Sequence, residues 1–527
     1  MKRFIRVIAF LLMSACLLAC VVACGNSNKQ DKPNTNNNSN NNNNLENDVG
    51  IPMPEIRDFG AGPDDPYVYK ALVRTGDSSA GTENGNNPTG NPYYAAIDFY
   101  TQNKDSKDVI EYAVYLRNST IEQNYNVRIE QVPQSGDMTQ QLRLAYMNGD
   151  EYDLTVILAK AAANAAMENL LSNLNNMPTL DLSHPSYDQK SIKELALGDA
   201  LYYLSGDMNV STLEVCGPTV VNLKMYDKYI EDFVESFDDK IYADIYNLVT
   251  AKKWTIETML AMADRVNDDA ESSDGPLGSH AEDVMGYFAY AGMGVYYFYG
   301  SGGRLTETDE EGNVNLVIEK YNNLYDYLFD KFNNQEGDNQ SWLPVGYSNE
   351  RWSIFSSGRC LFTEMTLYDI RVQLYPAEPF RYGILPNPTF EEGSDYHSVV
   401  NFTNCNHLWA IPNRVHNSEV AQQMMNIFAA YSNSEISGST MNAYYMRTLY
   451  YTTAPDAGSR QVMNIIKDSM VYDIALLYDW DDMGSRTLGE MTIGKRGLYA
   501  TNVSNQNNIQ KSLDQTVEQL KNPQMIK

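Results

Sequence analysis

Histidine and cysteine are scarce in this chain of 527 residues. The histidines are scattered, and only Cys405 and His407 lie close enough together to suggest shared metal ligands, which is too few for a site. We therefore expect no metal and no cofactor. After the first 24 residues the only cysteines are Cys216, Cys360 and Cys405. An odd, widely spaced set excludes a disulfide framework and predicts small buried hydrophobic side chains.

Basic residues are also in deficit, with 39 lysines and arginines against 68 acidic residues and a net charge of −29. Such a field repels phosphate backbones, so we expect no nucleic-acid partner. The chain has no nucleophile elbow, no HExxH helix and no glycine-rich phosphate loop. With so many carboxylates, pairs at glycosidase spacing arise by chance and indicate nothing. We expect no enzymatic activity.

The first residues indicate export. Lys2, Arg3 and Arg6 precede an apolar run, residues 7–23, that is short for a membrane span and typical of a secretory signal. The run ends Val-Val-Ala-Cys24-Gly, which resembles a bacterial lipobox, although Cys20 also follows a fitting segment and an ordinary signal peptide is an alternative. We expect residues 1–23 to be removed, Cys24 to carry lipid such as palmitate, and residues 24–50, rich in asparagine, to be a disordered tether. This predicts a protein held on the extracellular face of a Gram-positive cell membrane.

The length predicts two or three domains, and the pattern after Tyr67 is that of an α/β protein. Strand patterns at residues 67–73, 95–99, 124–132 and 153–158 alternate with helical patterns, which favours a mostly parallel sheet. Later segments are more helical, including residues 254–267, 316–332, 418–431 and 508–520. The acidic turn at residues 309–313 lacks the ligand alternation of an EF-hand and predicts a solvated hairpin.

One stretch, residues 198–229, predicts a passage of the chain from a first lobe to a second. An apolar hairpin is expected around residues 205–207, followed by an alternating strand pattern at residues 219–225, and residues 380–386 are expected to form a return passage. We assign residues 51–212 plus 390–432 to an N-terminal lobe and residues 213–389 plus 433–527 to a C-terminal lobe. A ligand cleft would then lie between them.

Several segments in this order resemble a known family: Tyr152 to Val156, Leu201-Tyr202, Val220 to Leu223, Ser357 to Phe362, Tyr382 to Pro386 and Leu408 to Pro412. Together with the lipobox and tether, they resemble the extracellular solute-binding lipoproteins of ABC importers, in the carbohydrate-binding family that includes maltose-binding protein, long Firmicutes form. The resemblance implies a periplasmic-binding-protein-like fold of two α/β lobes, joined by hinge crossings around a ligand cleft. Residues 76–91 and 335–349 read as insertions.

A sugar needs carboxylates and amides for its hydroxyls and aromatic planes for its C–H faces. Six residues are candidates for ligand binding: Asp207, Tyr287, Tyr290, Glu364, Arg371 and Trp409. Each has a structural alternative. Asp207 also suits a plain turn, the two tyrosines and Trp409 suit the core, and Arg371 could pair with Asp369. Glu364 stands out because it ends a strand, where α/β sheets place ligands.

The expected function is capture of a carbohydrate, an oligosaccharide, by a lipid-anchored monomer that delivers it to ABC permease subunits for sugar transport. Binding of a peptide or another metabolite on the same fold is an alternative. A surface adhesin or sensor accessory and a glycan hydrolase are rivals from other classes.

Overall fold

The computed structural model describes residue 45 and residues 49–75, 96–268, 283–333, 342–344, 354–377, 379–403, 406–493 and 503–521. Cys20, Cys24, the tether and Cys405 therefore lie outside the described residues, as do the first expected insertion and nearly all of the second. Within the described part of the chain, every helix is too short or too polar to cross a bilayer.

The N-terminal lobe is built on a sheet of four strands in the order β13-β3-β1-β2. The strands are β1 (Tyr67–Arg74), β2 (Val127–Gln134), β3 (Leu154–Leu158) and β13 (His407–Ala410). β1 runs parallel to both neighbours, with Val73 opposite Val156, whereas β13 is antiparallel to β3. The helices of this lobe are α2 (Val109–Tyr125), α3 (Met138–Asn148), α4 (Ala159–Met167), η2 (Leu174–Asn176), α5 (Gln189–Glu194) and α15 (Ser418–Ser432). The predicted parallel α/β pattern is confirmed here.

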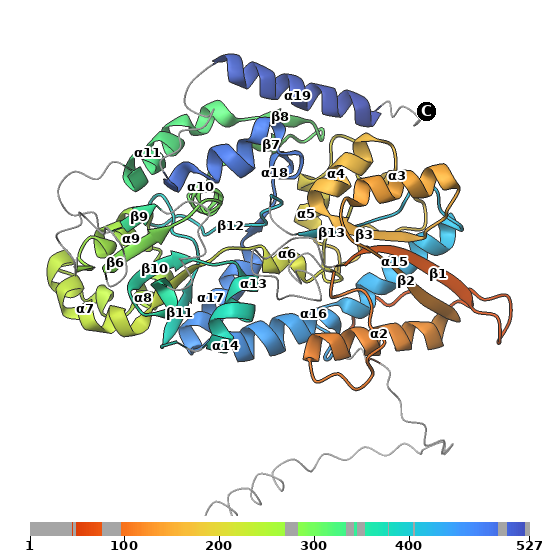
Figure 1. Ribbon diagram of the computed structural model, residues 1–527, viewed down its shortest axis with the longest axis horizontal. Coiled ribbons are helices and arrows are strands. Elements are labelled where there is room, and N and C mark those ends of the chain that lie inside the picture. The colour runs from red at the N-terminus through yellow and green to blue at the C-terminus, as the bar shows by residue number, and fades with distance from the viewer. Residues whose placement is uncertain are drawn as a thin grey trace, which may run out of the picture. The chain divides into compact units, whose positions relative to one another are not determined.

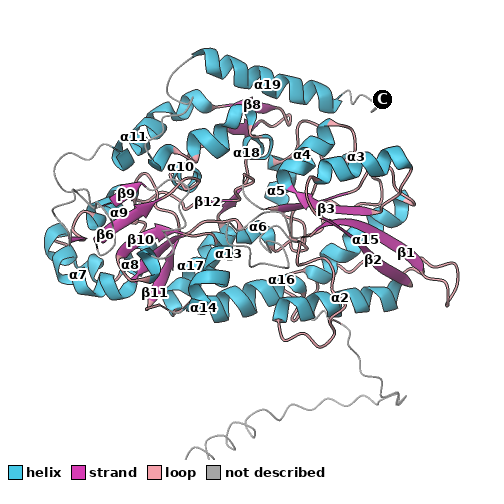
Figure 2. Cartoon of the chain, viewed as in Figure 1, coloured by secondary structure: helices cyan, strands magenta, loops and turns pink. Residues whose placement is uncertain are grey.

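The C-terminal lobe is built on a second, mixed sheet in the order β11-β4-β10-β6-β5, with β9 paired to β6. Its strands are β4 (Thr219–Asn222), β5 (Asn267–Asp268), β6 (Val284–Ala289), β9 (Trp342–Pro344), β10 (Cys360–Glu364) and β11 (Tyr382–Leu385). β10 is parallel to β6 and antiparallel to β4. Figure 2 shows the strands of the two sheets as separate groups. The two-lobed α/β fold class is thus confirmed.

Helices and two small strand pairs complete the C-terminal lobe. Its helices up to β11 are α7 (Leu223–Phe237), η3 (Lys240–Ala243), α8 (Ile245–Thr250), α9 (Ile256–Ala263), α10 (Gly294–Gly300), η4 (Ile318–Tyr321), α11 (Asn322–Asn333), α13 (Leu367–Asp369), η5 (Ile370–Leu374) and α14 (Tyr375–Ala377). Those after α15 are α16 (Thr440–Asn442), η6 (Ala443–Thr453), α17 (Ala457–Asp468), α18 (Ile474–Tyr478), η7 (Trp480–Asp482), η8 (Met483–Leu488), η9 (Met491–Ile493) and α19 (Val503–Lys521). Two small ladders pair β7 (Thr306–Thr308) with β8 (Val314–Leu316), around the predicted acidic hairpin, and β12 (Ser398–Val399) with β14 (Met470–Val471).

Within the residues that the structure describes, the chain passes between the sheets three times. The first passage runs from residue 198 to β4 and contains the one-turn helix α6 (Ser211–Glu214), which Figure 1 shows between the two sheets. The second leads from β11 to β13, and the third leads from α15 to α16. The return passage predicted at residues 380–386 is wrong: β11 lies within the second sheet beside β4, and the return comes after it. The exact lobe boundaries stay a prediction.

Two further local predictions are wrong. Residues 201–210 form no hairpin, because Leu204 pairs through its backbone with Trp409 of β13 and Gly206 pairs with Tyr187. The described part of the expected strand at residues 95–99 is a turn. Both segments are apolar, but their backbone groups pair with residues that are far away in sequence.

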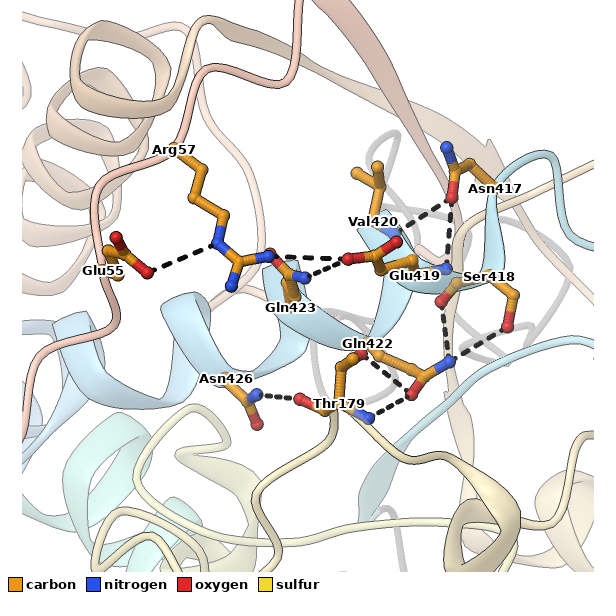
Figure 3. Close-up of polar contacts among 10 residues, drawn as sticks. All are labelled: Glu55, Arg57, Thr179, Asn417, Ser418, Glu419, Val420, Gln422, Gln423 and Asn426. Carbon is orange, nitrogen blue, oxygen red and sulfur yellow. Dashed lines mark hydrogen bonds and ion pairs between the residues drawn. The ribbon is translucent and has the colours of Figure 1, made fainter.

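α15 ties the N-terminal segment of the chain to the first sheet. Asn417 caps the N-terminus of α15: its side chain accepts hydrogen bonds from the backbone N–H groups of Glu419 (3.1 Å) and Val420 (3.2 Å) (Figure 3). Glu419 also forms an ion pair with Arg57 at 3.5 Å. On the buried face of α15, Phe428 packs against Tyr69 of β1, with ring centroids 5.7 Å apart. The segment before β1 is therefore part of the N-terminal lobe.

The apolar core is continuous across the lobes. One buried cluster contains the C-terminal sheet together with α4, and the second lies between the N-terminal sheet and α15. Cys216 and Cys360 are buried free thiols, as predicted. Burial raises the pKa of Cys216 to about 12, so this thiol stays protonated.

Candidate functional site

The parallel strands of both sheets end near the passages. In α/β sheets, ligands bind outside the carboxyl ends of parallel strands, because loops there converge from several strands. In this chain β1 is followed by a connection that includes Ala96 to Tyr100, β6 by Tyr290, and β10 by Met365 and α13. α6 contacts α13. These segments define the candidate site.

Asp98 links the connection after β1 to the first passage through a hydrogen bond. Its side chain is 2% exposed, and Oδ2 accepts a hydrogen bond of 2.7 Å from the backbone N–H of Val210, just before α6. Burial raises the pKa of Asp98 to about 6, although the Val210 N–H and the guanidinium of Arg117 both lower it. Among the described residues, the other carboxylate oxygen of Asp98 has no hydrogen-bond partner. Asp98 thus keeps an unused acceptor in a buried position.

Glu214, the last residue of α6, pairs with Arg371 of η5. Arg371 donates to Glu214 Oε1 through Nε at 3.1 Å and through Nη2. The side chain of Glu214 is 10% exposed and that of Arg371 is 16% exposed. Burial raises the pKa of Glu214, and the guanidinium partly offsets this effect. For Arg371, burial lowers the pKa, but the Glu214 carboxylate together with Tyr444 and Tyr368 raises it, and the pKa lies above its ordinary value. The pair joins the first passage to the segment after β10.

Two tyrosine rings flank this guanidinium. Arg371 Cζ lies 5.5 Å from the ring centre of Tyr368 and 6.0 Å from that of Tyr444. Tyr444 is fully buried, and its hydroxyl has no hydrogen-bond partner in the described structure. Arg371 and Tyr444 both lie on π-helical segments, η5 and η6, a conformation that is frequent at functional sites.

We name Asp98, Glu214, Tyr368, Arg371 and Tyr444 the junction cluster. It combines carboxylate acceptors, a guanidinium donor with fixed fork geometry, phenol hydroxyls and aromatic faces. This combination suits a neutral, polyhydroxylated molecule. Four of its members, Asp98, Glu214, Tyr368 and Tyr444, were not predicted from the sequence. Glu214 alone gives a signal, because it is an acid within the apolar run from Val210 to Cys216.

The predicted residues Glu364 and Tyr287 do lie together, but inside the second sheet. Glu364 is 0% exposed and accepts hydrogen bonds from Tyr287 Oη (2.7 Å), Thr219 Oγ1 (3.3 Å) and Tyr297 Oη. Burial raises the pKa of Glu364 to about 8, so the carboxyl group is mostly protonated at neutral pH. In this conformation neither side chain can touch a ligand, and together they support the strands beneath the candidate site.

Trp409 is likewise a core residue in this conformation. It is 0% exposed, and its ring packs edge-on against Phe99 and Phe428, each at 5.5 Å between centroids. Tyr290 is 8% exposed and directly follows β6, so it lies at the ligand edge of the sheet. Asp207 lies apart from the other five, in a cavity that none of them lines. Of the six predicted residues, the structure thus places Arg371 in the junction cluster.

Within the described residues, no group of three histidine, cysteine or acidic side chains is arranged to hold a metal ion.

No family model and no curated protein matches the chain. Solved structures do. A cyclo/maltodextrin-binding protein complexed with maltotetraose is 12% identical, with 88% of this chain and 99% of that chain covered and a TM-score of 0.49. The extracellular solute-binding protein from Staphylococcus aureus in complex with maltose is 10% identical, covering 87% and 98%, with a TM-score of 0.49. The galacto-N-biose-/lacto-N-biose I-binding protein of the ABC transporter from Bifidobacterium longum is 10% identical, covering 87% and 98%, with a TM-score of 0.47.

Proposed function

We propose that this chain is a lipid-anchored extracellular solute-binding protein that captures a carbohydrate, an oligosaccharide, for uptake by an ABC transporter. The observation that carries the proposal is the junction cluster. Acidic, cationic and aromatic side chains from the connection after β1, the first passage, the segment after β10 and η6 meet where two α/β lobes join. The ordered sequence segments and the lipobox-like N-terminus support the same function.

In this proposal the ligand makes contacts with both lobes and shifts their hinge equilibrium toward a closed state. Glu214 and the free oxygen of Asp98 accept sugar hydroxyls, while Tyr368 presents a ring to a C–H face. The protein binds its ligand without chemical change and passes it to permease subunits, acting as a monomer anchored through Cys24. Peptides or other metabolites remain the alternative ligands on this fold.

The first test is thermal unfolding of the body from Val49 onward with a panel of mono- and oligosaccharides. A ligand at a hundred times its dissociation constant stabilises the folded state by roughly 2.7 kcal/mol, which raises the melting temperature measurably. A rise with one sugar class supports the proposal, and its loss in Glu214→Gln assigns binding to the junction cluster. The matched control is Glu310→Gln, an exposed residue of the hairpin. No rise with any sugar, but a rise with a peptide, would assign the fold to the alternative ligand class.

A further inference from the structure

A cavity lies beside the passages and shares no residue with the junction cluster. It has a volume of about 460 Å³, within the range of small-molecule sites. Its walls come from both lobes: the loop before α5, residues around Asp207, α6, the third passage and the end of α17. Ile51, from the segment before β1, forms a further part of the wall. No residue that follows the parallel strands lines it.

The N-terminal segment is held in place on this side. The backbone carbonyl of Pro52 contacts His184 Nε2 at 2.7 Å, and the carbonyl of Pro54 accepts a hydrogen bond of 3.1 Å from Tyr125 Oη. Ile51 is therefore a defined part of the cavity wall. With Pro185, Leu213, Met441 and Met470 it gives the cavity an apolar lining.

The charged groups of the lining are unbalanced. Asp188, Asp207, Glu435 and Asp468 carry carboxylates, whereas the only basic lining residues are Lys190 and Lys467. Lys190 Nζ donates to the backbone carbonyls of Asp468 (3.0 Å) and Met470 (3.2 Å), so it bonds to no carboxylate there. Lys467 Nζ donates to Ser434 Oγ at 3.2 Å and lies 4.7 Å from the ring centre of Tyr445. The two lysines thus leave an excess of negative charge.

Asp207 has more acceptor capacity left than Asp188, its neighbour in the lining. Both carboxylate oxygens of Asp188 already accept hydrogen bonds, one from the backbone N–H of Ser191 at 2.9 Å and the other from the hydroxyl of Tyr472 at 2.9 Å. Asp207 Oδ2 accepts the backbone N–H of Ser434 at 2.7 Å, and no ion pair joins it to a lysine among the described residues. Burial raises its pKa to about 6, although the Ser434 backbone N–H and the charge of Lys467 lower it. A cation in the cavity would supply the missing partner.

We infer that this cavity is a binding site for a small organic cation, a primary ammonium group on an apolar body. The ammonium group sits against Asp207, the exposed carboxylates of Glu435 and Asp468 attract it at the rim, and the apolar body packs on Ile51, Leu213 and Met441. The site is separate from the carbohydrate site and does not depend on the proposed function.

The test uses 2-phenylethylamine as the probe, with the neutral 2-phenylethanol as its isosteric control, in isothermal titration calorimetry on the body from Val49 onward. We expect the amine to bind at least tenfold more tightly than the alcohol. Asp207→Asn keeps an acceptor for Ser434 but removes the charge, and should weaken amine binding at least tenfold. Asp199→Asn, an exposed position outside the cavity, is the matched control and should bind like wild type.

Two further variants complete the test. Ile51→Ala shortens the wall at a partly exposed position, so it should fold normally and weaken both probes several-fold. Arg371→Met disrupts the junction cluster and should leave amine binding unchanged, whatever the sugar panel shows. Equal affinity for amine and alcohol, or full amine affinity in a folded Asp207→Asn protein, would overturn the inference.

Discussion

At the scale of single residues, Glu364 gives the clearest pH signature. Its pKa rises from 4.5 to about 8 on folding, so the folded state keeps a proton that the unfolded state loses between these values. The stability contributed by this proton is complete below about pH 4 and is lost as the pH rises through 8, by roughly 1.4 kcal/mol per pH unit.

In Glu364→Gln this dependence should disappear, because the amide keeps hydrogen-bonding capacity and cannot titrate. Urea unfolding from pH 5 to pH 8.5 measures the free energy of unfolding of both proteins. As the pH rises, the variant should become more stable relative to wild type. Glu310→Gln serves as the exposed control. Parallel curves for Glu364→Gln and wild type would refute a proton on Glu364.

The Glu214–Arg371 pair predicts a second result. Arg371→Met leaves the buried Glu214 carboxylate without its partner and should lower the free energy of unfolding by about 3 kcal/mol. Adding Glu214→Gln removes the stranded charge, so the double variant should recover most of this loss. Denaturant unfolding of the two single variants and the double variant gives the coupling energy. Additive losses would mean that the two groups do not interact.

At the scale of elements, the start of α15 can be tested through its cap. Asn417→Ala removes the acceptor for two backbone N–H groups and should cost about 1 kcal/mol, whereas Asn417→Ser should restore most of it. Chemical unfolding compares the three proteins. An alanine variant as stable as wild type would show that neighbouring contacts, such as the Arg57–Glu419 ion pair, hold this end of the helix.

Elements with a strong local pattern were predictable. The apolar pattern in sequence matches the structure in β1, β3 and α15, because each of them buries one face or both faces along a single stretch of chain. The return passage at residues 380–386 was misplaced since a strand inside a sheet and a strand between lobes have the same alternation. Leu204 has an apolar neighbourhood in sequence but pairs with Trp409, a partner that no local pattern reveals.

The candidate site was less predictable for the same reason. Asp98 and Val210 are 112 residues apart, and Glu214 and Arg371 are 157 apart. Residue type and spacing within one segment identified Arg371 as a candidate. Its carboxylate partner was not predictable, because that partner depends on how the first passage packs against η5. Glu364 was predicted as a ligand-binding residue because it ends a strand, but the sequence could not show whether its side chain faces a ligand or the core.

At the scale of the whole molecule, attachment to the membrane is open to a direct test. If Cys24 carries the lipid, Cys24→Ala expressed in a Gram-positive host should move from the detergent phase to the aqueous phase, because the acyl chains supply the membrane affinity. Cys20→Ala is the matched control and should still partition with detergent. A Cys24→Ala protein that stays in the detergent phase would transfer the assignment to Cys20.

The position of β13 has a consequence for biogenesis. This edge strand of the N-terminal sheet is formed by residues 407–410, and α15, which covers the same sheet, ends at residue 432. The first lobe cannot be completed until most of the chain has left the ribosome. Until then the edge of β3 and the apolar face that α15 covers stay exposed and are prone to aggregation. If the chain is exported as proposed, such a delay keeps the newly made polypeptide unfolded long enough to be threaded through a secretion channel.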